Sequence, residues 1–146
     1  MKDIIDLIYG AKIAPDGNGF LVTFRDIENA FTYGESLDEA IFNAQEVLDL
    51  MLLDKLEKGE EICLPSTIKN GEMAISASPE VAAPALLHIM RQLEKRTMAD
   101  VASSMGVTYQ SYQRMESGKN LTMRSFKRAA SALGSSVEIR LRKRAS

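Results

Sequence analysis

Cysteine and histidine are almost absent from this chain. One cysteine, Cys63, and one histidine, His88, occur among the 146 residues. A single cysteine excludes an internal disulfide and a cysteine-rich zinc site, and Cys63, between Ile62 and Leu64, is interpreted as a small apolar residue. His88 lies in an apolar helical run, where neither a histidine metal cluster nor a Ser-His-Asp triad can be assembled around it. The sequence implies no metal and no cofactor.

Long apolar runs are also missing. The chain contains no stretch of about 18 apolar residues, the length that a membrane-spanning helix requires. Its first residues include Lys2, Asp3 and Asp6 and do not form a signal-peptide pattern. Apolar residues still make up 45% of the chain, which is ordinary for a globular protein. The composition therefore predicts a soluble cytoplasmic protein of one or two small domains, with no membrane partner.

Charge is distributed unevenly along the chain, although the net charge is only −2. Residues 1–80 contain six Lys and Arg against sixteen Asp and Glu, a net charge of −10. Residues 81–146 contain twelve against four, a net charge of +8. A basic half attracts phosphate groups, whereas an acidic half repels them and favours a basic partner. The two halves are therefore predicted to have different tasks.

The most informative pattern spans residues 97–118 and predicts two short helices around a tight turn. Thr97 and Thr108 are suited to cap the two helices, and Gly106 stands where a left-handed helix cap favours glycine. Inward positions recur at helical spacing: Val101, Ala102 and Met105 in the first helix, Tyr112 and Met115 in the second. Other side chains of the second helix face outward. This arrangement is typical of a helix-turn-helix, whose second helix enters a DNA groove.

Residues 97–134 resemble the Cro/Xre-type helix-turn-helix of phage-repressor-like regulators. The matching residues are Val101-Ala102, Gly106-Val107-Thr108, Glu116-Ser117-Gly118-Lys119, Ala129-Ala130 and Ala132-Leu133-Gly134. The family usually carries Gln early in the first motif helix, where this chain has Met98. In the family that Gln braces the recognition helix and contacts a phosphate, so the resemblance implies one DNA contact fewer here. The alternative is a helical bundle that only dimerises.

Residues of the predicted second helix and of the loop after it are the candidates for contacts with DNA. By position, Tyr109, Gln110 and Arg114 match the base-reading side chains of the family. Gln pairs bidentately with adenine and Arg with guanine, and Tyr109 can pack on a thymine methyl group, while Gln113 can reach bases or backbone. Candidates for phosphate contacts, which position a protein without specifying sequence, are Thr108, Lys119, Asn120 and Arg124.

The first half of the chain has the pattern of an α+β domain. Alternation of apolar residues predicts strands over residues 4–13, 20–25, 30–33 and 73–77. Residues 15–19 are rich in turn formers and predict a hairpin between the first two strands. Ser36 and Glu39 form a capping box, and the apolar stripe that follows, over residues 37–52, predicts a helix packed on the sheet.

Four segments in this half resemble the HicB antitoxin family. They are Gly19-Phe20-Leu21-Val22-Thr23-Phe24, Asp26-Ile27, Gly34-Glu35-Ser36-Leu37-Asp38-Glu39-Ala40 and Leu64-Pro65-Ser66. The family has a reduced RNase H-like N-terminal domain followed by a DNA-binding domain. Two departures concern loop geometry: Arg25 stands where the family often has Pro, and Glu28-Asn29 replaces a common Pro-Gly.

The resemblance implies the antitoxin of a HicAB-like type II toxin–antitoxin system. Such proteins bind and block a small basic RNA-cleaving toxin, HicA, and this chain would repress its own operon as a homodimer or higher homo-oligomer on a palindromic operator. The expected toxin contacts are acidic loop residues: Asp16, Asp26, Glu28 and Glu35. One alternative is a stand-alone transcriptional regulator whose N-terminal domain senses a small ligand.

A nuclease is a third interpretation of an RNase H-like domain. Such catalysis needs several carboxylates that converge on two metal ions. Asp6 lies on the polar face of a predicted strand, and Asp16 and Asp26 are typical turn residues. Nothing in the sequence brings the three together, so we expect no enzyme activity.

The second half is predicted to begin at a helix over residues 79–95 with Pro84 inside it. This helix places the domain boundary near Ser78, which gives domains at residues 1–77 and 78–146. Thr122 is suited to cap a last helix. Val137, Ile139 and Leu141 then alternate with polar residues and predict a short terminal strand, whose open edge is expected to pair with the same strand of a second subunit. The basic tail, residues 142–144, is either a solvated end or a phosphate contact.

Overall fold

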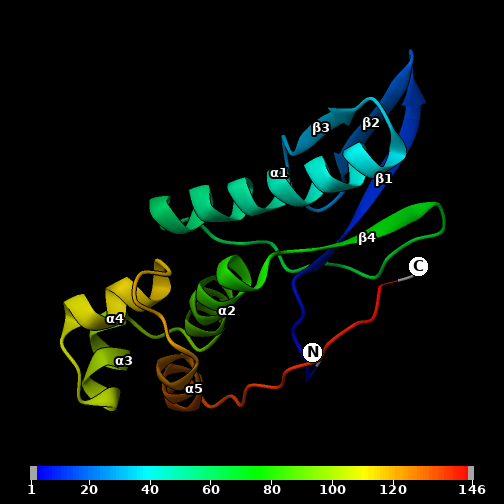
Figure 1. Ribbon diagram of the computed structural model, residues 1–146. Coiled ribbons are helices and arrows are strands. Elements are labelled where there is room, and N and C mark those ends of the chain that lie inside the picture. Colours follow the sequence, from blue (N-terminus) through cyan, green and yellow to red (C-terminus); the bar gives the residue numbers. More distant parts are fainter. Residues whose placement is uncertain (1–2, 145–146) are drawn as a thin grey trace.

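The computed structural model describes residues 3–144 and has an antiparallel sheet with one long helix, followed by a group of shorter helices (Figure 1). The elements are β1 (Ile8–Asp16), β2 (Gly19–Phe24), β3 (Phe31–Gly34), α1 (Leu37–Lys58), β4 (Glu72–Ser76), α2 (Pro79–Leu93), α3 (Met98–Met105), α4 (Tyr109–Glu116) and α5 (Met123–Ala132). The strand order is β3-β2-β1-β4. The predicted α+β class is confirmed.

The predicted hairpin joins β1 to β2. Asp16 pairs with Gly19, which leaves a two-residue turn at Gly17 and Asn18. Gly17 has a φ of 60°, a conformation that favours glycine. The strands extend further into residues 15–19 than the turn-forming composition predicted, because turn residues at a hairpin end can still pair across the ladder.

Helix α1 covers one face of the sheet (Figure 1) and packs on it through a stripe of small and branched residues. The buried members are Ala40, Ala44, Leu48 and Leu52. Ser36 Oγ accepts from the Glu39 backbone N–H at 3.1 Å, as predicted. The Glu39 carboxylate accepts from the N–H of Glu35 at 3.3 Å, where a capping box would use the N–H of Ser36. Gly59 ends the helix in a left-handed conformation with φ 68°.

The segment between α1 and β4 is held against the sheet by Arg25. Its guanidinium donates to both carboxylate oxygens of Glu72, at 2.8 and 2.9 Å, and to Asp26, Ser66 and the Thr67 carbonyl. Hydrogen bonds from Arg25 and from the Lys69 N–H lower the pKa of Glu72 to about 2. Arg25, a departure from the HicB pattern, therefore has a structural role at this position.

Helix α2 belongs to two apolar cores at once. Val81, Ala85 and Ile89 pack in the core between α1 and the sheet, whereas Leu87 packs among the later helices. The helix runs unbroken through Pro84, as predicted. The boundary predicted at Ser78 falls at the N-cap of this shared helix; the division into residues 1–77 and 78–146 stays a prediction.

The later helices form the predicted helix-turn-helix with α5 packed beside it. Thr97, Thr108 and Thr122 each accept a hydrogen bond at a helix N-terminus, as expected from the sequence. Gly106 has a φ of 70° and ends α3, so that α4 can turn back across it. Buried Val101, Ala102, Tyr112, Ala129 and Leu133 fill the space between the helices.

The predicted terminal strand is absent from the described chain. Residues 135–144 run in an extended path without strand pairing. Val137 packs against the helical core, but Ile139 and Leu141 are exposed and Arg140 pairs with Asp6 at 2.9 Å. Within residues 3–144 this segment pairs with none of the four strands, so its alternating pattern forms no strand.

Candidate functional site

The predicted DNA-contacting side chains gather on α4 and the turn that follows it. Tyr112 is buried and Met115 is half-buried, which leaves the opposite side of the short helix to solvent. The exposed candidates are Thr108, Tyr109, Gln110, Gln113, Arg114, Lys119, Asn120 and Arg124. Asn120 has a φ of 55°, so the turn reverses sharply between α4 and α5. All eight residues are thus accessible, with Arg124 in the first turn of α5; their contacts with DNA stay a prediction.

Cations of the basic half divide into two groups. Arg91, Arg96 and Arg128 are used inside the fold: Arg91 bonds Glu116, Arg96 bonds Asp100, and Arg128 bonds the Met105 carbonyl. Arg114, Lys119 and Arg124 are exposed and form no ion pair within residues 3–144. The second group keeps its charge available to phosphate or base edges.

Glu116, at the end of α4, is the centre of a buried polar cluster. Its carboxylate accepts from Arg91 Nε at 2.6 Å and Nη2 at 3.0 Å, and lies 3.0 Å from His88 Nδ1. Burial raises the pKa of Glu116, but the hydrogen bonds from His88 and Arg91 outweigh it, so the pKa lies below its usual value. An ionised Glu116 therefore ties α4 to α2.

His88 extends this cluster toward the sheet domain. Its Nε2 lies 2.9 Å from the backbone oxygen of Glu60, just after α1. Both ring nitrogens thus lie at hydrogen-bond distance from an oxygen atom, one of the Glu116 carboxylate and one of the Glu60 backbone. Arg91 supplies the positive charge that the buried carboxylate requires. The cluster links the end of α4, α2 and the segment after α1.

The sequence gives little sign of this cluster. Glu116 is part of the Glu-Ser-Gly match to the helix-turn-helix pattern, and His88 stands alone in an apolar run. Their separation of 28 residues puts the partnership beyond any local rule. A buried charge inside an otherwise apolar helical face is the one signal available, because such a charge needs a partner.

The four acidic residues predicted to contact a toxin lie at opposite ends of the sheet. Gly34 pairs with Phe20, and Phe20 with Pro15, so Asp16 and Glu35 share the hairpin end. Asp26 and Glu28 lie in the β2–β3 turn at the other end. The Asp26 carboxylate already accepts from the Ser66 N–H and hydroxyl, both at 2.8 Å. The structure does not bring the four into one site.

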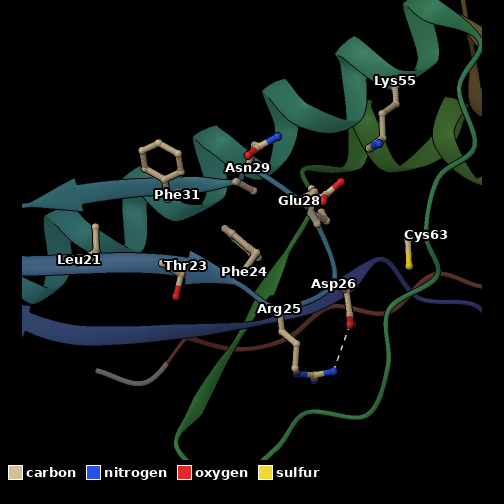
Figure 2. Close-up of a pocket in the computed structure, with 12 residues that line it drawn as sticks. Leu21, Thr23, Phe24, Arg25, Asp26, Glu28, Asn29, Phe31, Lys55 and Cys63 are labelled. Carbon is tan, nitrogen blue, oxygen red and sulfur yellow. Dashed lines mark hydrogen bonds and ion pairs between the residues drawn. The ribbon is translucent and has the colours of Figure 1, made fainter.

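A shallow hollow opens beside the β2–β3 turn (Figure 2). Its lining mixes charges of both signs, Arg25 and Lys55 against Asp26 and Glu28, with apolar Phe31 at its edge. Asp26 is held by Arg25 across 3.1 Å, marked by the dashed line in Figure 2. Two of the four charged residues that line the hollow are therefore already paired with each other.

The carboxylates considered for a nuclease have other partners or positions. Asp6 pairs with Arg140, Asp26 with Arg25 and Ser66, and Asp16 lies at the hairpin end. Among residues 3–144, no three His, Cys, Asp or Glu side chains group as metal ligands would. In the same part of the chain, no helix combines the length and apolar character needed to span a bilayer.

The chain matches two known families, and the two matches meet within α2, the helix that packs in both apolar cores. Residues 8–84 match the family described as HicB-like antitoxin of a bacterial toxin–antitoxin system. The chain belongs to the HicB antitoxin family. Residues 87–139 match a helix-turn-helix family, which confirms the DNA-binding motif expected from the sequence.

Two HicB proteins are similar to the chain over nearly its whole length. "Antitoxin HicB 2" of Photorhabdus laumondii subsp. laumondii is 33% identical over 133 residues, covering 90% of this chain and 94% of that protein. "Antitoxin HicB" of Escherichia coli strain K12 is 30% identical over 127 residues, covering 86% and 91%. The likeness therefore includes both the HicB domain and the helix-turn-helix.

Met98 occupies the position at which the helix-turn-helix family usually carries Gln. Its side chain packs, half-buried, against the helical core formed by Val101, Tyr112 and Leu133. The thioether supplies apolar packing where an amide would supply hydrogen bonds. In this chain the α3–α4 contact is thus apolar at that position, and Glu116 supplies the polar brace of α4.

Proposed function

We propose that this chain is the antitoxin of a HicAB-like system, with one task for each end of the molecule. Its sheet domain binds and inhibits a small basic HicA-like toxin that cleaves RNA. Its helix-turn-helix binds the operator of its own operon in the cytoplasm and represses transcription. Neither task requires the chain to act as an enzyme.

The main support for the proposal is that the two halves of the chain have opposite net charges. Residues 1–80 have a net charge of −10, and residues 81–146 have a net charge of +8. An acidic domain repels RNA phosphates but attracts the basic surface with which a toxin would hold RNA, so it can occlude that surface. Asp16, Glu28 and Glu35 are exposed and favour such an approach, while Asp26 is used within the fold.

The exposed cations of the helix-turn-helix support the proposal that it binds DNA. Arg114 on α4, Lys119 in the turn after it and Arg124 at the start of α5 are exposed, as are Tyr109 and Gln110 on α4. Side chains that hydrogen-bond base edges and cations that pair with phosphates are the two components of sequence-specific binding. We infer that α4 is the recognition helix.

A second copy completes the DNA-binding unit in this proposal. Ile139 and Leu141 alternate with polar residues and are exposed, so the tail can pair with the same segment of another copy through its unbonded backbone edge. Two recognition helices about 34 Å apart would then enter successive major grooves of a palindromic operator.

Co-expression tests the proposal. The small basic protein encoded beside this chain is expressed alone and together with the tagged chain, and growth and co-purification are measured. Growth arrest by the neighbour alone, with relief and a stable complex on co-expression, is the expected result. Absence of both toxicity and complex would leave a ligand-sensing regulator as the better account. Specific binding to the upstream DNA is measured separately by gel shift.

A further inference from the structure

Helix α1 has apolar residues on the side that faces away from the sheet. Phe42, Leu50 and Leu53 have exposed fractions of 62%, 64% and 39%. Their spacing of eight and three residues puts them on one side of a helix. The buried stripe, Ala40, Ala44, Leu48 and Leu52, lies on the opposite side. Figure 1 shows α1 lying on the sheet with its other side turned away from the remaining elements.

Carboxylates accompany these apolar residues. Glu46 and Glu57 are exposed and fall on the same side, four residues after Phe42 and four after Leu53. The two basic residues of α1 point elsewhere: Lys58 bonds Asp54 at 3.0 Å, and Lys55 lies 3.8 Å from Glu60. We call Phe42, Glu46, Leu50, Leu53 and Glu57 the outer face of α1. At 1.5 Å per residue it is about 22 Å long.

We propose that the outer face of α1 is the surface on which the basic toxin docks, an inference that rests on the proposed antitoxin function. Large exposed apolar side chains that become buried supply most of the affinity of an interface. Carboxylates around them attract a basic partner and speed its association. The exposed loop carboxylates Asp16, Glu28 and Glu35 add to this attraction from both ends of the sheet domain.

A second copy of the chain fits this surface poorly. A two-fold interface brings the same patch of both copies together, so Glu46 and Glu57 of one copy would meet those of the other with no basic residue on the face to offset them. The hollow beside Phe31 fits a basic partner less well, because Arg25 and Lys55 lie in its lining.

Matched substitutions in the full-length chain test the proposal. Phe42→Lys and Leu50→Lys change the outer face, and Phe31→Lys is the control, because Phe31 is 62% exposed, as Phe42 is, but lies on β3. The probe is the purified small basic protein encoded beside the chain, with Kd measured by calorimetry. We expect Phe42→Lys and Leu50→Lys each to weaken binding at least about tenfold and Phe31→Lys to change it less than about twofold. Thermal midpoint and operator affinity should stay at wild-type values in all three.

Each result has a distinct meaning. If the unsubstituted chain fails to bind the probe, the proposed function is wrong and the docking surface with it. If that chain binds and both α1 variants keep its Kd, the docking surface alone is wrong. A loss confined to Phe31→Lys would move the toxin to the sheet edge. If the α1 variants change the native mass of the free chain, a second copy covers the face, which also overturns the proposal.

Discussion

Arg114 and Lys119 are both exposed cations near the recognition helix, yet they are expected to act differently. Arg114 lies on α4, where we propose that it pairs with a guanine edge, whereas Lys119 lies in the turn after the helix, where we propose that it contacts a phosphate. Base contacts specify a sequence and phosphate contacts do not. The distinction can be measured by varying one operator base pair at a time.

Arg114→Ala should relax discrimination at a single base pair by about 1–3 kcal/mol. Lys119→Ala should weaken binding to all operator variants alike and reduce the slope of log K against log salt by about one. Fluorescence anisotropy on a set of single-base operator variants gives both quantities. Uniform loss of affinity with both variants would show that Arg114 reads no base.

Glu116 is the residue whose replacement should most affect folding. Glu116→Gln leaves the half-buried guanidinium of Arg91 without its anion and removes the carboxylate that His88 contacts. Loss of one partner from a buried ion pair typically costs about 3–5 kcal/mol. We expect the free energy of unfolding, measured in urea, to fall by about 3 kcal/mol.

Glu94→Gln is the matched control for Glu116→Gln. Glu94 is exposed at the end of α2, so its replacement should change the free energy of unfolding by less than about 0.5 kcal/mol. Equal urea midpoints for the two variants would contradict the structural role given to the His88–Glu116–Arg91 cluster.

At the scale of elements, Glu72 joins β4 to Arg25 and to the segment after α1. Its pKa is held at about 2 in the folded chain, against a usual value of 4.5. A carboxyl group with a lowered folded pKa stabilises the fold above its unfolded pKa, and this contribution disappears as the pH falls from about 4.5 toward 2. Acid should therefore weaken the attachment of β4.

Glu72→Gln removes this pH dependence. The variant should melt below the unsubstituted chain at pH 7, and the gap between the two melting temperatures should narrow as the pH is lowered through 4.5. Thermal unfolding followed by circular dichroism from pH 7 to pH 3 measures the gap. A constant gap over this range would mean that the bonds from Arg25 and Lys69 do not set the pKa of Glu72.

Local rules were enough to predict most of the elements. Threonines 97, 108 and 122 cap helices because a cap depends on a hydroxyl and the next few residues. The sheet followed from alternation and from turn chemistry at the hairpin. The exact helix bounds were less well predicted: the helix expected over residues 79–95 ends at Leu93.

Contacts between distant parts of the chain were not predictable in the same way. Arg25 and Glu72 are 47 residues apart, and His88 and Glu116 are 28 apart. Their pairing depends on the packed fold, which sequence periodicity does not describe. The candidate DNA contacts were easier to propose, because all lie within one local motif. The toxin contacts were not, because the sequence does not show how far apart four acidic residues lie in the fold.

The terminal segment, residues 135–144, is the part of the chain that we expect to pair with a second copy. Ile139 and Leu141 have the alternation of a strand, but a strand forms only where another edge is available. In a dimer, the same segment of the partner would provide that edge. Pairing of two such tails would therefore give the two-fold symmetry that we predict for binding to a palindromic operator.

Replacing Ile139 and Leu141 together by Asp should convert the dimer into a monomer and weaken operator binding, because the paired tails would lose their apolar face. Replacing Glu138 and Arg142 by Ser, on the other side of the tail, should leave the dimer intact. Light scattering after size exclusion measures the mass. A dimer that survives both pairs of substitutions would place the two-fold interface elsewhere on the molecule.

At the scale of the whole molecule, the central claim is that this HicB-family chain neutralises an RNA-cleaving toxin. The most direct test titrates the purified full-length chain into an RNA-cleavage assay of the small basic protein encoded beside it. We expect cleavage to fall to background near a fixed stoichiometric ratio and added operator DNA not to restore it. Undiminished cleavage at saturating concentrations of the chain would contradict the claim, whatever the helix-turn-helix proves to bind.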